Sequence, residues 1–526
     1  DHVNNNNQEV AELIYFVCRF GTVHCVSHLH SNQKWCFCSR SSTYTTYGCN
    51  QPKETGLHHL CFVCRTFFVL QILSSITVED VVFGGQLDGI EVDEFWIEET
   101  VDYGGQLVRG DTLDGHELLS VDATKLDVKV PIILWWTGFT GERGKVKTCG
   151  EDKCFFTVDR HFQHHPRTKV FMYYGTDVRS LDLPLPRKPH HEWALLHEES
   201  PKNNYKLTQP ECLTLFNHTS TFKRQSDFPI TTQYLEKLSD LSSTEYLVPT
   251  QEKSKGDLAP VVFVQSDCDP PSDRDSYVRE LMKHIRVDSY GACLHNRDLP
   301  SELVDPLTMD NRKFHEILAR YKFHISFENA ICDDYITEKF WRAIKIGSVP
   351  IYRGSPSIKD WLPTENAAII ADDFASPEEL AKFLKYLDEN DEEYEKHLDF
   401  KKTGITNERL LAEMNSRKWG VNDYSEKNFI DTFECDVCNR VNENERAIKE
   451  NRKPQTHIAK AEHYNCPRPT YYNPENPNTN IDLYMQLYDQ GKYEARALRY
   501  FIDSGKNFTR AEYRDLAQKM MVQDRL

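Results

Sequence analysis

A chain of 526 residues is long enough for two or three domains with separate cores, and its apolar (39%) and charged (27%) fractions are ordinary for a globular protein. The formal net charge of −18, with lysines and arginines interspersed among acids, excludes a nucleic-acid-binding protein, because it would repel a phosphate backbone. Sixteen cysteines indicate an oxidising compartment, as do two N-glycosylation sequons, at Asn217 and Asn507.

Residues 1–75 differ from the rest of the chain. They open with an asparagine run, hold seven of the cysteines and show poor hydrophobic periodicity. Close cysteine pairs such as Cys61 and Cys64 offer thiolates for zinc, but the spacings form no regular ligand set. We therefore expect a disordered or non-native segment here, followed by an acidic stem or linker at 76–128.

Neither a signal peptide nor a membrane span is visible in the sequence. The apolar run from Phe67 to Leu73 is too short to cross a bilayer and lacks a basic flank. The chain begins with Asp1 rather than methionine, so we expect a fragment, and the missing anchor says little about the full gene product.

From residue 129 onward, short apolar runs alternate with helical stretches, a pattern typical of α/β layering. A first series predicts buried strands at Ile132–Trp136, Val170–Tyr174 and Trp193–Leu196. A second series predicts, in order, strand Val261–Gln265, helix Asp273–Arg286, strand Val287–Tyr290, strand Phe323–Phe327, helix Tyr335–Ile346 and strand Val349–Tyr352. Gly347 suits a left-handed helix C-cap, and Ser376 followed by proline suits an N-cap.

The two series predict two doubly wound domains that face each other, with a ligand crevice beyond the carboxyl ends of their strands. The N-terminal domain is expected at 129–250 and the C-terminal domain at 258–440. Residues 441–526 are charged and dotted with prolines, with one amphipathic tail from Tyr493 to Met521. We interpret them as an extension that wraps back over the domains.

The stretch from Phe327 to Phe340 carries the most chemistry, because it runs from a strand end into a helix N-terminus. Backbone amides and the helix dipole attract an anion there. Lys339 adds a cation for a diphosphate, Glu338 offers acceptors for ribose hydroxyls, and Asn329 faces the same crevice. The alternative is a capped helix in which Glu338 pairs with a basic residue one turn later. The residues alone leave both interpretations open.

This stretch, continued through Pro350, resembles the FEN…DYxTEKxxxAxxxGxVP signature of the α1,3-fucosyltransferases, glycosyltransferase family 10. Residues 266–291 resemble the arginine-bearing helix of that family, and residues 199–219 resemble its acceptor-side motif. The likeness spans about residues 131–440.

Within the family, residues 196–204 and 352–357 are most similar to a divergent subgroup described as protein O-fucosyltransferases. Proteins of that subgroup are assigned to the endoplasmic reticulum and to serine or threonine of EMI modules. One departure is that the family's Tyr-Arg-Arg-Asp-Ser-Asp run reads Phe222-Lys223-Arg224-Gln225-Ser226-Asp227 here. This run belongs to the acceptor side, so the departure concerns the acceptor more than the donor.

The resemblance implies a GT-B-like fold of two Rossmann-like domains and an inverting transfer of L-fucose from GDP-fucose, with no metal cofactor. Arg274 and Lys339 would neutralise the pyrophosphate, whose charge grows as GDP leaves. Asn329, Tyr335 and Glu338 would position phosphate, fucose or ribose.

Glu199 would be the general base that takes the proton of the acceptor hydroxyl. Its neighbour Glu198 competes for this role, although side chains next to each other on an extended segment point in opposite directions. The acceptor is either an N-acetylglucosamine of a glycan or a serine or threonine of a protein. A non-catalytic lumenal protein that binds GDP-fucose is the alternative from another class, and a transferase for another nucleotide sugar is a further one.

Family members tie a C-terminal cysteine pair back to the N-terminal domain. The resemblance therefore implies two bridges between Cys149 and Cys154 on one side and Cys435 and Cys438 on the other. It also implies a secretory-pathway enzyme of the Golgi stack or endoplasmic reticulum, attached as a single-pass type II membrane protein. The partners of five further cysteines stay open: Cys212, Cys268, Cys293, Cys332 and Cys466.

Asp267-Cys268-Asp269 imitates the DxD metal motif of other glycosyltransferases. Because cationic side chains can replace the metal in the inferred site, we favour the alternative of a loop whose cysteine forms a disulfide.

Overall fold

The computed structural model describes residues 127–138, 144–305, 308–421 and 427–525, together with the backbone of four strands between residues 18 and 48. The chain divides into two compact units, residues 1–108 and 109–526. The apolar run from Phe67 to Leu73 and nearly all of the expected stem lie outside the described residues.

The described part of the first unit is an antiparallel sheet with the strand order β1-β2-β3-β4. Each strand pairs with the next one along the chain, so the sheet is a simple meander. Its strands are β1 (Cys18–Phe20), β2 (Val23–His30), β3 (Gln33–Arg40) and β4 (Thr43–Gly48).

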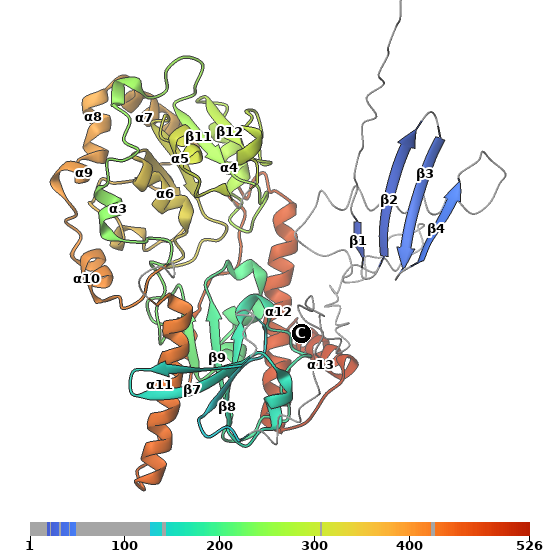
Figure 1. Ribbon diagram of the computed structural model, residues 1–526. Coiled ribbons are helices and arrows are strands. Elements are labelled where there is room, and N and C mark those ends of the chain that lie inside the picture. The colour runs from blue at the N-terminus through green and yellow to red at the C-terminus, as the bar shows by residue number, and fades with distance from the viewer. Residues whose placement is uncertain are drawn as a thin grey trace, which may run out of the picture. The chain divides into compact units, whose positions relative to one another are not determined.

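The second unit contains two α/β lobes, each built around one sheet (Figure 1). The sheet of the N lobe has the order β10-β9-β8-β5-β7-β6, and every neighbouring pair is parallel except β6 with β7. Its strands are β5 (Ile132–Trp135), β6 (Lys145–Cys149), β7 (Asp152–Thr157), β8 (Thr168–Tyr174), β9 (Glu192–His197) and β10 (His218–Thr221).

The sheet of the C lobe is parallel throughout and has the order β12-β11-β13-β14-β15. Because β12 and β13 lie on opposite sides of β11, the strand order reverses there, and ligands of such sheets bind beyond the strand ends at this point. The strands are β11 (Val261–Val264), β12 (Val287–Tyr290), β13 (Phe323–Phe327), β14 (Val349–Arg353) and β15 (Ile369–Ile370). The predicted fold class, two Rossmann-like domains, is confirmed.

Local signals in the sequence set the helix ends of the C lobe. Thr337 caps α6 by accepting a hydrogen bond from the amide of Lys339, so this helix begins three residues later than predicted. Gly347 ends it in the left-handed conformation, as expected. The helices from the domain junction onward are α3 (Leu238–Ser242), α4 (Arg274–Leu281), α5 (Arg312–Leu318), α6 (Glu338–Ile346), α7 (Pro377–Glu389), α8 (Asp391–Glu395), α9 (Phe400–Thr403) and α10 (Glu408–Ser416).

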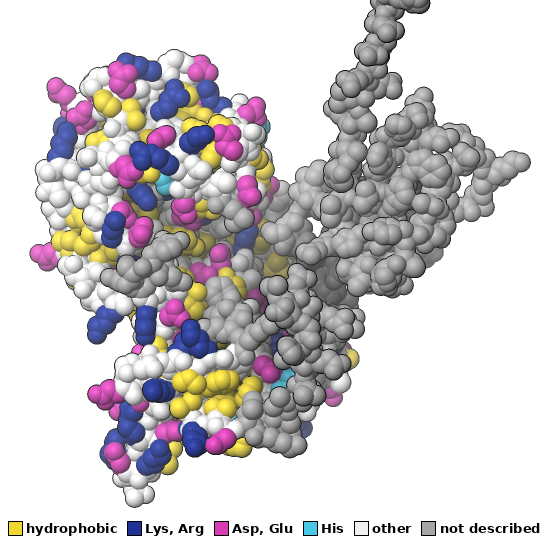
Figure 2. Space-filling view, in the orientation of Figure 1, with side chains coloured by type: hydrophobic (Ala, Val, Ile, Leu, Met, Phe, Trp, Pro, Cys, Tyr) yellow, Lys and Arg dark blue, Asp and Glu magenta, His cyan; other side chains and the backbone are white. Residues whose placement is uncertain are grey.

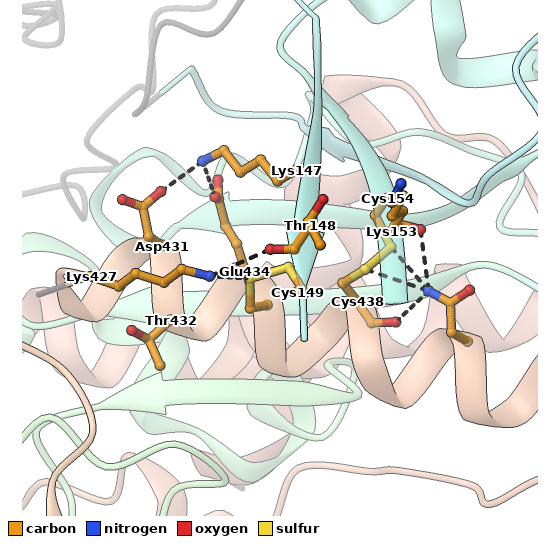
Figure 3. The surroundings of a disulfide bond; sticks show 12 residues. Lys147, Thr148, Cys149, Lys153, Cys154, Lys427, Asp431, Thr432, Glu434 and Cys438 are labelled. Atoms are coloured by element: carbon orange, nitrogen blue, oxygen red, sulfur yellow. Dashed lines mark hydrogen bonds and ion pairs between the residues drawn. A yellow bond between two sulfur atoms is a disulfide. The ribbon is translucent and has the colours of Figure 1, made fainter. Parts of the chain in front are cut away.

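The next helix, α11 (Phe429–Lys449), returns to the N lobe and packs on β6 and β7 (Figure 1). The implied bridges form as Cys149–Cys435 and Cys154–Cys438. Beside them, the ammonium of Lys147 bonds to Asp431 at 2.7 Å and to the buried Glu434 at 2.5 Å (Figure 3). The predicted boundary at residue 440 therefore falls inside a helix of the N lobe.

The C-terminal extension contacts both lobes. Residues 459–464 bond to β10 and to the segment before it, and Cys466 forms a disulfide with Cys332 of the C lobe. The amphipathic tail that was predicted as one segment is two helices, because Gly505 adopts φ +63° between them. They are α12 (Asn480–Ser504), which packs on the short α2 (Pro210–Leu213), and α13 (Arg510–Arg525).

Within the described ranges, no helix combines the length and the apolar character needed to cross a membrane. On the face of the molecule shown in Figure 2, basic and acidic side chains are interspersed over both lobes. This mixture agrees with the charge pattern read from the sequence.

Candidate active site

A pocket of about 210 Å³ opens at the strand-order reversal of the C lobe. One wall is polar and comes from the loop after β11, from Asn329 after β13 and from the first turns of α6. The other wall is apolar and comes from Leu299, Leu303, Val304, Met309 and Phe314. Such a division suits a ligand with a flat apolar group at one end and anionic groups at the other.

Gly291 closes the floor of this pocket. Its φ of +78° is unfavourable for residues with a side chain, and an added Cβ would lie 2.5 Å from the carbonyl oxygen of Gln265. The backbones of the two loops that follow β11 and β12 therefore approach more closely than any other residue would allow.

Two of the predicted donor-binding residues, Glu338 and Lys339, form an ion cluster on the polar wall. The ammonium of Lys339 lies 3.0 Å from Glu338 and 3.8 Å from Glu328, and only 8% of the residue is exposed. Burial would raise the pKa of Glu338, but the charges of Lys339 and Arg342 outweigh it and lower the pKa to about 2. Glu338 is therefore a carboxylate at any physiological pH.

Sequence reasoning missed the role of Glu328, although this residue belongs to the quoted stretch. Its fully buried carboxylate accepts hydrogen bonds from the amide of Thr337 at 2.8 Å and from the hydroxyl of Thr337 at 2.7 Å. Glu328 thus holds the residue that caps α6 and fixes the position of Lys339 in the pocket wall. A carboxylate directly before Asn329 gives no local signal for this contact.

Arg274 lies beneath the pocket and does not line it. The guanidinium is fully buried and donates to the carbonyl of Phe327 at 3.0 Å, to the side-chain oxygen of Asn329 at 2.6 Å and to the carbonyl of Asp267 at 2.6 Å. Arg274 therefore orients Asn329 and the loop after β11, and it adds a positive charge under the pocket floor.

The N lobe presents Glu199 directly after β9, at the carboxyl edge of its sheet. Glu199 is half-buried, and its backbone carbonyl accepts a hydrogen bond from Tyr464 of the extension at 3.3 Å. Glu198 points elsewhere, since its carboxylate accepts the hydroxyl of Tyr174 at 3.1 Å on β8. Burial, together with the charge of Glu199, raises the pKa of Glu198 to about 7.

Two tyrosines, Tyr335 and Tyr234, are affected by the charges of both Glu199 and Glu338. Burial raises the pKa of Tyr335, and the charges of Glu328, Glu199 and Glu338 raise it further. Burial also raises the pKa of Tyr234, with further increases from Glu338 and Glu199. Both tyrosines therefore lie near carboxylates of the N lobe and of the C lobe.

The sequence run that departs from the family pattern also joins the lobes. The guanidinium of Arg224 bonds to the buried carboxylate of Asp334 at 2.5 Å and to Asp360 at 2.7 Å, and it stacks on Trp361. Asp334 stands in the loop between β13 and α6. Arg224 thereby connects the acceptor-side run to the loop that carries Tyr335.

The metal-like motif at residues 267–269 is a disulfide-bonded loop, with a Cys268–Cys293 bridge. The bridge consumes both sulfurs of the cluster Cys268, Asp275 and Cys293, which among the described residues has the spacing of a metal site. Among the cysteines whose side chains the structure describes, all of which lie after residue 126, Cys212 alone is a free thiol, and it is buried.

The two sequons stand in contrasting surroundings. The side-chain amide of Asn217 donates to the carbonyl of His457 and accepts from the amide of Trp193, both at 2.8 Å. Asn507 is exposed in the turn between α12 and α13.

A second pocket, of about 440 Å³, lies beside the Cys149–Cys435 bridge and contains none of the catalytic or donor-binding candidates.

Comparison with known families matches both lobes. Residues 128–234 match the family described as "Fucosyltransferase, N-terminal", and residues 251–457 match "Glycosyltransferase family 10 (fucosyltransferase) C-term". The two matched segments cover more than half of the chain, and every candidate catalytic and donor-binding residue falls inside them.

Among curated proteins, the "GDP-fucose protein O-fucosyltransferase 3" of Rattus norvegicus is 48% identical over 471 residues, which cover 86% of this chain and 95% of the relative. The protein with the same description in Gallus gallus is 53% identical over 409 residues, covering 76% and 86%. A solved structure described as an α1,3-fucosyltransferase with GDP is 15% identical, covers 65% of this chain and 95% of that one, and gives a TM-score of 0.34.

Proposed function

Because this chain belongs to glycosyltransferase family 10, the fucosyltransferases, we propose that it transfers L-fucose from GDP-fucose to a hydroxyl of a protein acceptor. The proposal of a protein acceptor draws on the relatives described as GDP-fucose protein O-fucosyltransferases. Secretory-pathway residence is part of the proposal, and the disulfides of the described chain support it.

The observation that carries the proposal is a contact between the Glu199 segment and the pocket of the C lobe: the ammonium of Lys202, three residues after Glu199, lies 2.7 Å from Asp267 in the pocket wall. A nucleotide pocket on one lobe and a solvent-accessible carboxylate on the other are what a single displacement needs. The acceptor hydroxyl enters from the side of Glu199, while the donor leaves its diphosphate on the side of Lys339.

In the proposed reaction, Glu199 removes the proton of the acceptor hydroxyl as its oxygen attacks the anomeric carbon. The bond to GDP breaks on the opposite face, so the anomeric configuration inverts. Lys339 stabilises the charge that develops on the departing diphosphate, and Arg274 adds its positive charge from below. Glu338 and Asn329 contribute oxygens and an amide for ribose or fucose hydroxyls.

The test is release of GDP from GDP-fucose in the presence of two acceptor classes. One is a folded, disulfide-bonded EMI module with serine and threonine hydroxyls, and the other is an oligosaccharide that ends in N-acetylglucosamine. We expect turnover above the hydrolysis rate with the protein acceptor. Turnover only with the oligosaccharide would reject the protein-acceptor part of the proposal.

The catalytic role is tested by Glu199→Gln with Glu198→Gln as its matched control. Loss of a general base lowers kcat by roughly 10²- to 10⁴-fold, so Glu199→Gln should show that loss while GDP affinity is preserved. Glu198→Gln should keep a rate within about tenfold of the unchanged chain. Full activity of Glu199→Gln would remove it from the mechanism, and GDP binding without turnover on any acceptor would favour a non-catalytic binding protein.

A further inference from the structure

A cation of the N lobe reaches the mouth of the donor pocket. The ammonium of Lys202, three residues after Glu199, lies 2.7 Å from both carboxylate oxygens of Asp267. Asp267 lines the pocket of the C lobe. The two side chains are 13% and 36% exposed, so the contact is partly shielded from water.

The backbone around Lys202 is fixed before any ligand enters. Ser200 accepts a hydrogen bond from the amide of Lys202, and the side chain of Asn204 donates to the carbonyls of Gly175 and Val178, both at 3.0 Å. These contacts hold the short helix η6 (Pro201–Asn203) against the end of β8. Lys202 is therefore presented to the cleft by a rigid base, and its long side chain is the movable part.

Negative side chains outnumber positive ones among the residues that line the pocket, and the nearby Arg274 already bonds to Phe327, Asn329 and Asp267. Three carboxylates line the pocket (Asp267, Asp305 and Glu338), against the two cations Lys339 and Arg342. Both cations already lie beside Glu338, at 3.0 Å and 3.8 Å. A ligand that brings further negative charge is repelled by this wall unless another cation comes close.

We propose that Lys202 is a donor-binding residue that leaves Asp267 and binds the diphosphate of the nucleotide sugar from across the cleft. This inference rests on the proposed donor and extends it, because it assigns part of diphosphate recognition to the acceptor-side lobe. Asp267 holds the ammonium at the pocket mouth when no nucleotide is bound. When the nucleotide binds, the ammonium exchanges one anionic partner for another, so its charge remains compensated in both states.

Lys202 thereby connects the two substrates. It lies on the segment that also carries Glu199, so contact with the diphosphate fixes the distance between the proposed base and the leaving group.

The test measures GDP and guanosine affinity by calorimetry and by competition, on Lys202→Met, Asp267→Asn and Lys202→Arg. We expect Lys202→Met to weaken GDP binding by roughly 10- to 100-fold, the range for a hydrogen bond to a charged group, and to leave guanosine binding unchanged. Asp267→Asn should strengthen GDP binding, since it removes a carboxylate that competes for the ammonium. Lys202→Arg keeps the charge and should retain most of the affinity.

The opposite changes in GDP affinity expected for Lys202→Met and Asp267→Asn distinguish this role from a purely structural contact between the lobes. If the pair only held the lobes together, Lys202→Met and Asp267→Asn would both break it and change GDP affinity in the same direction, which would overturn the inference. Equal GDP affinity of Lys202→Met and the unchanged chain would also overturn it. If the unchanged chain bound no GDP at all, the proposed donor itself would be wrong, and the two failures are thus distinguishable.

Discussion

The two disulfide bridges that join α11 to the N lobe are predicted to overlap in their contribution to the free energy of unfolding. Cys149–Cys435 and Cys154–Cys438 close loops of 286 and 284 residues. On the chain-entropy relation, closing the first such loop stabilises the fold by about 5–6 kcal/mol at 25 °C. Once one bridge exists, the second closes a ring of only about eight residues, which contributes about 2–3 kcal/mol.

Removing either pair should therefore cost about 2–3 kcal/mol of bridge stabilisation, while removing both should cost about 8 kcal/mol. The assay is urea unfolding of the two paired Cys→Ala variants and of the fourfold variant, compared in a double-mutant cycle. Lost packing of the buried sulfurs adds to each variant separately, so it cancels in the coupling term. Costs that simply add would refute the reasoning, because they would mean that each bridge constrains the unfolded chain independently.

Three further outcomes are expected. Burial raises the pKa of Glu198 from 4.5 to about 7, so its contribution to stability is fully present below pH 4.5 and is lost as the pH rises to about 7. Glu198→Gln should lack this loss and should be more stable than the unchanged chain at neutral pH by at most about 3 kcal/mol, measured in melting curves against pH. Arg224→Ala should cost about 3–5 kcal/mol in urea unfolding, because the buried Asp334 keeps its hydrogen bonds from Ser357 and Trp361 but loses its cation. The exposed Arg409→Ala should change stability by less than about 1 kcal/mol. Gly291→Ala should destabilise by about 1–3 kcal/mol and weaken GDP binding in calorimetry, because a side chain does not fit its positive φ or the nearby backbone; an unchanged GDP affinity would contradict the close approach.

Much of the C lobe could be predicted from the sequence because its signals are local. Apolar runs marked β11, β13 and β14, and the cap residues at Gly347 and Ser376 marked helix ends where the structure has them. The strands β6 and β10 were missed for opposite physical reasons. β6 is an exposed edge strand, and β10 is a buried run of polar residues whose hydroxyls bond to the distant His463.

The residues of the candidate site also divide into those with a local sequence signal and those whose contacts are distant in the sequence. The position of Glu338 and Lys339 at the start of α6 could be predicted because a helix N-terminus is a local pattern, and their role in donor binding stays a prediction. The Lys202–Asp267 and Arg224–Asp334 contacts join residues 65 and 110 positions apart, and their strength depends on burial that no local pattern encodes. The cap made by Glu328 likewise depends on how β13 meets α6.

The return of α11 to the N lobe has a mechanical consequence. The polypeptide passes between the lobes on the way to β11 and again after α10, and the Cys332–Cys466 bridge ties the extension across them a third time. Two connections can act as a hinge about which the lobes rotate, whereas a third connection restricts that rotation. The three connections therefore restrict how far the two lobes can move apart without reduction of the Cys332–Cys466 bridge.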